Sequence, residues 1–116
     1  MPARIGVDQD RRRLLEGEIE RMVRLFPDLG VRKAILFGSL ARGDVTASSD
    51  IDLILVMDTP KRFVDRLDDI IRALRPRVGL DVLVYTPEEF EELRRSRAFV
   101  QSAVKEGKVI YEAQSR

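Results

Sequence analysis

Residues 38–53 read GSLARGDVTASSDIDL, a turn of small residues followed by two aspartates. The apolar residues 34–37 stand just before the turn, and we expect them to form a buried strand that ends at Gly38. Glycine lets the backbone come close to a ligand, because it has no Cβ. We expect Ser39 to cap a short helical turn whose backbone N–H groups face an anion. This turn therefore predicts a phosphate-binding site.

Asp50 and Asp52 stand where a second strand is expected to begin, ahead of the apolar residues 53–56. Because side chains alternate along a strand, both carboxylates should lie on one face. Two like charges this close repel each other, and a divalent cation relieves that repulsion. Proteins bind Mg²⁺ with a few carboxylates together with phosphate oxygens of the substrate. The two aspartates therefore predict a magnesium site beside the phosphate turn.

A third carboxylate, Asp81, interrupts the apolar strand expected over residues 79–85. A charge in such a strand is costly unless it is paired or bound to a metal, so we expect Asp81 to complete the metal site. The chain has no cysteine and no histidine. That composition excludes disulfides, thiolate or imidazole catalysis and the usual zinc sites, and it leaves oxygen ligands.

The motif Gly38-Ser39, followed after ten residues by Asp50-x-Asp52, resembles the signature of the DNA polymerase β-type nucleotidyltransferase superfamily. Either half alone is typical of an ordinary turn or a solvated loop end, whereas the two at this spacing favour a metal and nucleotide site. Over roughly residues 32–112 the chain is similar to the minimal nucleotidyltransferases of prokaryotes, called MNT proteins, which are often encoded beside a helical HEPN protein. The resemblance implies a polymerase β-like α/β fold.

The same resemblance implies roles for individual residues. Asp50 and Asp52 would bind two Mg²⁺ ions that bridge a nucleoside triphosphate, and Asp81 would bind the metal near the attacking hydroxyl. Gly38 and Ser39 would hold the β and γ phosphates. Two further loop residues could either order the loop or touch the nucleotide: Arg42 and Ser49.

The activity implied is the transfer of AMP from ATP to a hydroxyl acceptor. For MNT proteins the acceptor is a tyrosine of a HEPN ribonuclease toxin, which the transfer silences, so the chain would be an antitoxin. The chain has no room for an acceptor domain, and we expect a partner chain to complete the site. Two alternatives stay open: a non-catalytic nucleotide-binding antitoxin that acts by contact, and a transferase for a small hydroxylated molecule such as an aminoglycoside.

The rest of the chain predicts a single α/β domain, a small mixed β-sheet packed with helices, over residues 1–116. Its net charge of +1 is spread along the sequence, so we expect no broad nucleic-acid surface. No signal peptide or membrane span is recognisable, and we expect a cytoplasmic location. A homo-oligomer remains open, because apolar helix faces could pack on another copy or on the core.

Helical periodicity predicts the remaining elements. A first helix is expected over about residues 10–26, ended by Pro27 and Gly30, and the resemblance implies a catalytic core over about residues 32–112. We expect Thr59 to cap a helix that continues up to Pro76, and Thr86 with Glu89 to form the capping box of the next one. A charge run at a helix start is usually a solvated face, and we interpret residues 11–13, three arginines, in that way. The apolar stripes are Leu15, Ile19, Met22 and Phe26 in the first helix, and Phe63, Leu67, Ile70 and Leu74 in the second.

Overall fold

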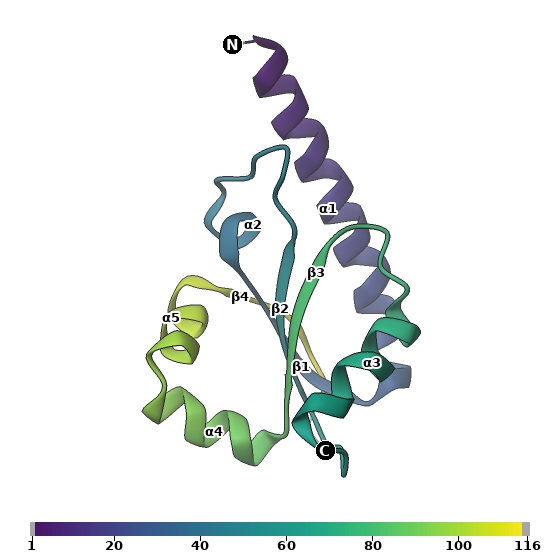
Figure 1. The fold of residues 1–116 in the computed structure, drawn as a ribbon, viewed down its shortest axis with the longest axis vertical. Coiled ribbons are helices and arrows are strands. Elements are labelled where there is room, and N and C mark those ends of the chain that lie inside the picture. Colours follow the sequence, from purple (N-terminus) through teal and green to yellow (C-terminus); the bar gives the residue numbers. More distant parts are fainter. Residues whose placement is uncertain (1, 115–116) are drawn as a thin grey trace.

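Helices and strands alternate along the chain in a computed structural model, which describes the backbone of residues 2–114 and the side chains of residues 6–114 (Figure 1). The elements are α1 (Pro2–Leu29), β1 (Val31–Phe37), α2 (Gly38–Arg42), β2 (Ile51–Met57), α3 (Phe63–Leu74), β3 (Leu80–Tyr85), α4 (Pro87–Ser96), α5 (Ala98–Glu106) and β4 (Lys108–Glu112). The strands form one sheet in the order β3-β2-β1-β4. Strand β1 is antiparallel to β2 and β4, and β2 is parallel to β3. The predicted mixed α/β sheet is confirmed.

The central strands are apolar on both faces because helices cover both sides of the sheet (Figure 1). In β1, Ala34 and Leu36 belong to the core cluster that includes Leu15 and Phe26 of α1, and Ile35 belongs to the cluster formed with α4 and α5. Alternate side chains of one strand thus enter two different cores. This arrangement explains why residues 34–37 of β1 and 53–57 of β2 read as continuous apolar runs.

Helix α1 is longer than predicted. Pro27 lies inside its last turn, and the helix ends only at Leu29, before Gly30 with φ +77°. A proline this near the end removes one intrahelical hydrogen bond, and the apolar side chain of Leu29 still packs on the core. Because the helix also begins well before residue 10, its first half runs beside the loop that follows α2 (Figure 1).

Helix α3 begins later than predicted. Thr59 does not cap it; its hydroxyl accepts a hydrogen bond from the Lys61 amide, and α3 starts at Phe63. Ile70 is buried in the core as expected, whereas Phe63 and Leu67 are 45% and 46% exposed. The first turns of α3 therefore present apolar side chains to solvent.

The capping box of α4 is confirmed: Thr86 accepts from the Glu89 amide, and the Glu89 carboxylate accepts from the Thr86 amide. Glu89 also pairs with Arg66 of α3, which is 7% exposed. The same guanidinium donates to the carbonyl oxygens of Lys61 and Val84. Arg66 thus joins α3, β3 and α4 through one buried group.

We expect Arg66→Met to lower the free energy of unfolding by about 1–3 kcal/mol, because the buried Val84 carbonyl and the Glu89 carboxylate would each lose a hydrogen bond from the guanidinium. Urea denaturation of the variant and of Arg62→Met measures the difference. Arg62 is an exposed neighbour whose only side-chain partner among the described residues is Asp65, so its loss should cost under about 1 kcal/mol. Equal losses in the two variants would contradict the role given to Arg66.

Glu18 of α1 is a buried carboxylate that ties this helix to the segment between α3 and β3. It accepts hydrogen bonds from Arg21 and from the Arg77 amide, and Arg21 also donates to the Arg75 carbonyl. The Arg21 hydrogen bonds are the largest cause that lowers the pKa of Glu18 to about 2. The ionised form therefore stabilises the fold at neutral pH.

A depressed pKa contributes stability that is present above the ordinary glutamate value and is lost as the pH falls toward 2. We therefore expect Glu18→Gln to cost roughly 2 kcal/mol at pH 7 and markedly less at pH 3. Urea unfolding of both proteins at the two pH values measures this. A difference in stability that does not change between pH 7 and pH 3 would refute the assignment.

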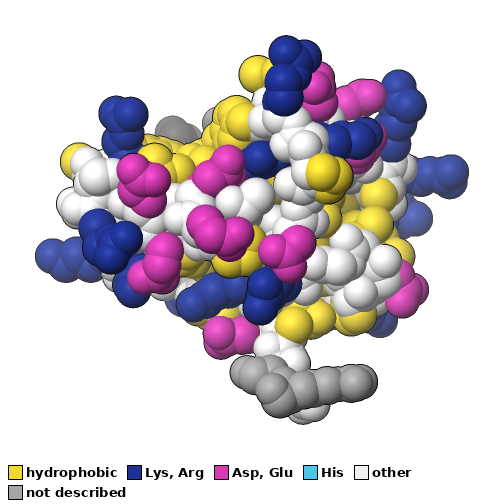
Figure 2. All heavy atoms as spheres, turned by 90° about the horizontal axis from the view of Figure 1, so that it is seen from below, with side chains coloured by type: hydrophobic (Ala, Val, Ile, Leu, Met, Phe, Trp, Pro, Cys, Tyr) yellow, Lys and Arg dark blue, Asp and Glu magenta, His cyan; other side chains and the backbone are white. Residues whose placement is uncertain are grey.

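Charged side chains of both signs are interspersed on the face seen from below, with apolar side chains exposed between them (Figure 2). No helix in the described part of the chain combines the length and the apolar character needed to cross a bilayer.

Candidate active site

The turn after β1 is shaped by Gly38, which has φ +76°. Phe37 and Asp52 are register partners on β1 and β2, so the start of α2 lies against the Asp52 side chain. A Cβ on Gly38 would collide with the Asp52 carboxylate. Glycine is therefore required here both by the backbone conformation and by close packing.

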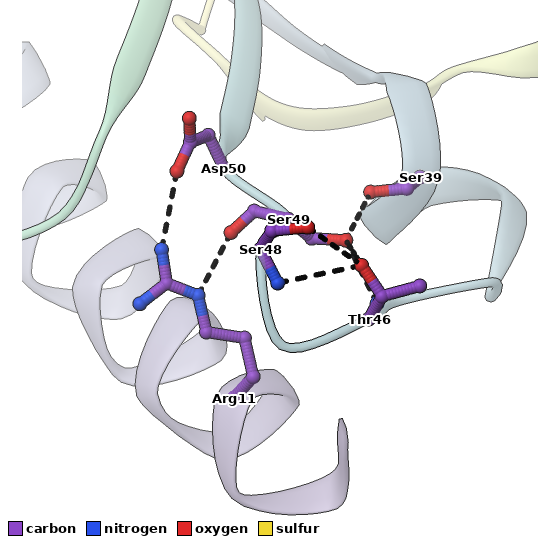
Figure 3. Close-up of polar contacts among 6 residues, drawn as sticks. All are labelled: Arg11, Ser39, Thr46, Ser48, Ser49 and Asp50. Atoms are coloured by element: carbon purple, nitrogen blue, oxygen red, sulfur yellow. Dashed lines mark hydrogen bonds and ion pairs between the residues drawn. The ribbon is translucent and has the colours of Figure 1, made fainter. Parts of the chain in front are cut away.

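Ser39 does not cap α2 as predicted. The N-cap position is Phe37, without a side-chain hydrogen bond, and the Ser39 hydroxyl instead donates to Ser49 Oγ at 2.9 Å. Ser49 Oγ also accepts from the Thr46 amide at 2.8 Å (Figure 3). Of the two roles left open for Ser49, these contacts support ordering of the loop. Arg42 is exposed beside the turn, with Nε 3.3 Å from an Asp44 carboxylate oxygen.

Asp52 and Asp81 are adjacent because β2 and β3 are parallel and these residues are register partners. Burial raises the pKa of Asp52 to about 6, and the negative charges of Asp81 and Asp50 add to the rise. The site is therefore short of positive charge. A divalent cation fits this donor set, because carboxylate oxygens are its preferred ligands and its charge would relieve the repulsion.

Asp50 precedes β2, and its carboxylate lies against Gly79, where a Cβ would collide with it. The Ile51 amide donates to the Gly79 carbonyl at 3.0 Å, which holds the two segments together. Within residues 6–114 no three acidic side chains converge as a ready-made metal cluster. The structure thus brings Asp52 and Asp81 together and leaves Asp50 beside them, facing another partner.

That partner is Arg11 of α1. Its Nε donates to the Ser49 carbonyl at 2.8 Å, and a terminal nitrogen contacts Asp50 Oδ1 at 3.1 Å (Figure 3). Arg12 donates to the Gly43 carbonyl at 3.0 Å. The interpretation of residues 11–13 as a solvated face is therefore wrong for Arg11 and Arg12. Only the length and path of α1 bring these arginines to the loop, and no local pattern encodes that.

The structure also corrects the reasoning about Asp81, which is exposed and therefore carries no burial cost. Strand β3 is at the edge of the sheet, so its first residues border solvent. No buried charge therefore requires a metal at Asp81, although Asp81 lies next to Asp52, as expected for a shared site.

Two cavities meet at Asp52. One, of about 460 Å³, is bordered by the small-residue turn, and the other, of about 380 Å³, is bordered by Asp81. Phe37, Asp52 and Phe99 line both of them. Phe99 of α5 is 54% exposed and meets the Phe37 ring edge to face. Nothing in the sequence singles out Phe99 as a site residue, because an apolar side chain in so short a helix is typical of the core.

Comparison with known proteins agrees with this geometry. Residues 15–112 match the family described as "Nucleotidyltransferase domain". Over 84 residues the chain is 37% identical to a curated protein of Methanocaldococcus jannaschii named "Putative protein adenylyltransferase MJ0604", covering 70% of this chain and 79% of that protein.

Solved structures share the fold. A "putative nucleotidyltransferase from Sulfolobus solfataricus" aligns with a TM-score of 0.57 and 24% identity over 93% of this chain and 86% of that one. A toxin–antitoxin crystal structure with AMP-PNP aligns with a TM-score of 0.52 and 23% identity, over 83% of this chain and 74% of that one. At these identities the likeness supports the fold.

Proposed function

Because the chain belongs to the nucleotidyltransferase domain family, we propose that it transfers AMP from ATP to a hydroxyl group of a partner protein. The acceptor proposed is a tyrosine of a HEPN toxin, and the role is that of a cytoplasmic antitoxin. The observation that carries the proposal is the pair of cavities that meet at Asp52. The turn at Gly38 and Ser39 borders one cavity, and Asp81 borders the other, beside apolar side chains.

The proposed nucleotide site is the 460 Å³ cavity. Gly38 and Ser39 lie at the start of α2, where backbone N–H groups favour phosphate oxygens, and Arg42 borders the same cavity. Asp52, with Asp50 and Asp81 beside it, would hold Mg²⁺. The bound ions would stabilise charge on the attacking and leaving oxygens.

The proposed acceptor site is the 380 Å³ cavity, which Asp81 borders together with Leu67, Leu83 and Phe99. An aromatic ring would fit these apolar side chains while its hydroxyl faced Asp81, which would favour loss of the hydroxyl proton. The acceptor oxygen then forms a bond to the α phosphorus, and the bond from that phosphorus to the pyrophosphate oxygen breaks. Position and charge supply most of this catalysis, so a small domain can suffice.

Two observations support a protein partner: an exposed apolar surface and the similar toxin–antitoxin structures. The exposed apolar residues Phe63 and Leu67 of α3 continue from the acceptor cavity, so a protein surface could cover both. The crystal structure with AMP-PNP is of a toxin–antitoxin, and another similar structure is of the toxin–antitoxin MntA-HpeT, with a TM-score of 0.50 and 21% identity over 83% of this chain and 74% of that one.

Intact-mass spectrometry of the chain that co-purifies from the native host tests the proposal. We expect Mg²⁺ and ATP to add one or more AMP units to that chain, and Asp52→Asn to abolish the addition. A bound partner that gains no mass would instead favour an antitoxin that acts by contact. Modification of a small hydroxylated molecule without any partner would favour a transferase that acts on small molecules.

A further inference from the structure

Arg11 makes two contacts with the active-site loop from outside the family's shared region. It lies before residue 15, where the match to the family begins. Its Nε donates to the Ser49 carbonyl, and its terminal nitrogen contacts Asp50 Oδ1 (Figure 3). The Arg11 side chain is only 21% exposed, whereas its neighbour Arg13 on α1 is exposed. The contacts therefore hold an otherwise free side chain in one place.

Of the three carboxylates at the site, Asp50 is the one that pairs with the Arg11 guanidinium. Asp50 already has a cation at 3.1 Å, whereas the pair Asp52 and Asp81 has none among the ion pairs of the described residues. An oxygen that accepts from a guanidinium and faces its positive charge is a poorer ligand for a second cation. To bind a metal ion, Asp50 would therefore have to give up its contact with Arg11.

We propose that Arg11 is a positioning residue that competes with the divalent cation for Asp50. The inference rests on the proposed role of Asp50 as a metal ligand. When a cation binds, the terminal nitrogen gives up Asp50 Oδ1, and Nε keeps its hydrogen bond to the Ser49 carbonyl. Because the two contacts use different nitrogens, the loop stays anchored while its carboxylate changes partner.

The sign of the effect separates competition from simple support of the loop. If Arg11 only ordered the loop, its removal would loosen Asp50 and weaken cation binding. If Arg11 competes, its removal strengthens cation binding. Asp50 is 46% exposed, so the pair is partly screened, and we expect a change of about threefold in the dissociation constant.

The experiment is a titration with Mn²⁺ alone, followed by the electron paramagnetic resonance signal of the free ion. It uses the wild type, Arg11→Gln, Arg11→Lys and the control Arg13→Gln, which removes the same charge from an exposed neighbour on α1. We expect about threefold tighter binding in Arg11→Gln, and near wild-type binding in Arg11→Lys and Arg13→Gln. In an Asp50→Asn background, Arg11→Gln should change nothing.

Unchanged or weaker binding in Arg11→Gln, with Arg11→Lys folded and binding as the wild type does, would overturn the competition and leave the proposed function standing. The same threefold gain in Arg13→Gln would also overturn it, since the effect would then be one of net charge. Failure of the wild type to bind Mn²⁺ alone would overturn the competition, and failure to bind it with ATP present as well would overturn the proposed metal chemistry.

Discussion

Asp52→Asn is expected to lower the rate of nucleotidyl transfer by about a thousandfold or more while the protein stays folded. Asp52 borders both cavities and lies next to Asp81, so its negative charge would help to hold a cation bound at the site. The amide of asparagine keeps the shape but loses the negative charge, and the loss of metal-assisted charge stabilisation costs several kcal/mol in the transition state. Single-turnover transfer from labelled ATP measures the rate.

Asp58→Asn is the matched control, because Asp58 follows the other end of β2 and is exposed. Its rate should equal that of the wild type. The folded state of Asp52→Asn should be at least as stable as the wild type without metal, since burial and neighbouring charges disfavour the Asp52 carboxylate. Transfer by Asp52→Asn within tenfold of the wild-type rate would refute the site.

Gly38→Ala should have the second largest effect. Its φ of +76° disfavours any side chain, and its Cβ would meet the Asp52 carboxylate. Relief of that collision must move either the turn or the carboxylate. We expect a loss of about 2–4 kcal/mol in stability and at least a hundredfold in transfer rate, because small displacements of a catalytic group are costly.

Gly43→Ala separates strain from collision. Gly43 has φ +85°, but a Cβ there would meet nothing within 4 Å. The control should therefore lose only about 1 kcal/mol, the cost of the left-handed backbone, and keep most of its activity. Urea unfolding and single-turnover transfer compare the two variants, and equal effects on transfer would contradict the packing argument.

The core of this fold was predictable because its signals are local. The apolar runs of residues 34–37 and 53–56 specify two strands, and the four-residue and three-residue spacings from Leu15 to Phe26 specify a helix that is buried on one side. The capping box at Thr86 is equally local, since both partners lie within one turn. In these elements the decisive contacts lie within a few residues, and sequence and structure agree.

The rest depends on contacts between distant segments. Arg11 reaches Asp50 across 39 positions in the chain, and nothing near either residue encodes that pairing. Asp81 borders solvent because β3 is an edge strand of the sheet. The order of the strands decides this, and the residues around Asp81 do not encode that order. One exception is local: Thr59 was expected to cap α3, but its hydroxyl accepts a hydrogen bond from the Lys61 amide, two residues further on, and the helix begins later. Local propensity competes with such alternatives and does not decide between them.

In the proposed reaction, this site transfers the nucleotidyl group of ATP to a partner protein. The most direct test incubates the protein and its co-purified partner with ATP labelled on either the α or the γ phosphate. We predict that the α label becomes covalently attached to the partner, that the γ label leaves as pyrophosphate, and that Asp52→Asn attaches neither. Stable attachment of the γ label would show phosphoryl transfer instead and contradict the account.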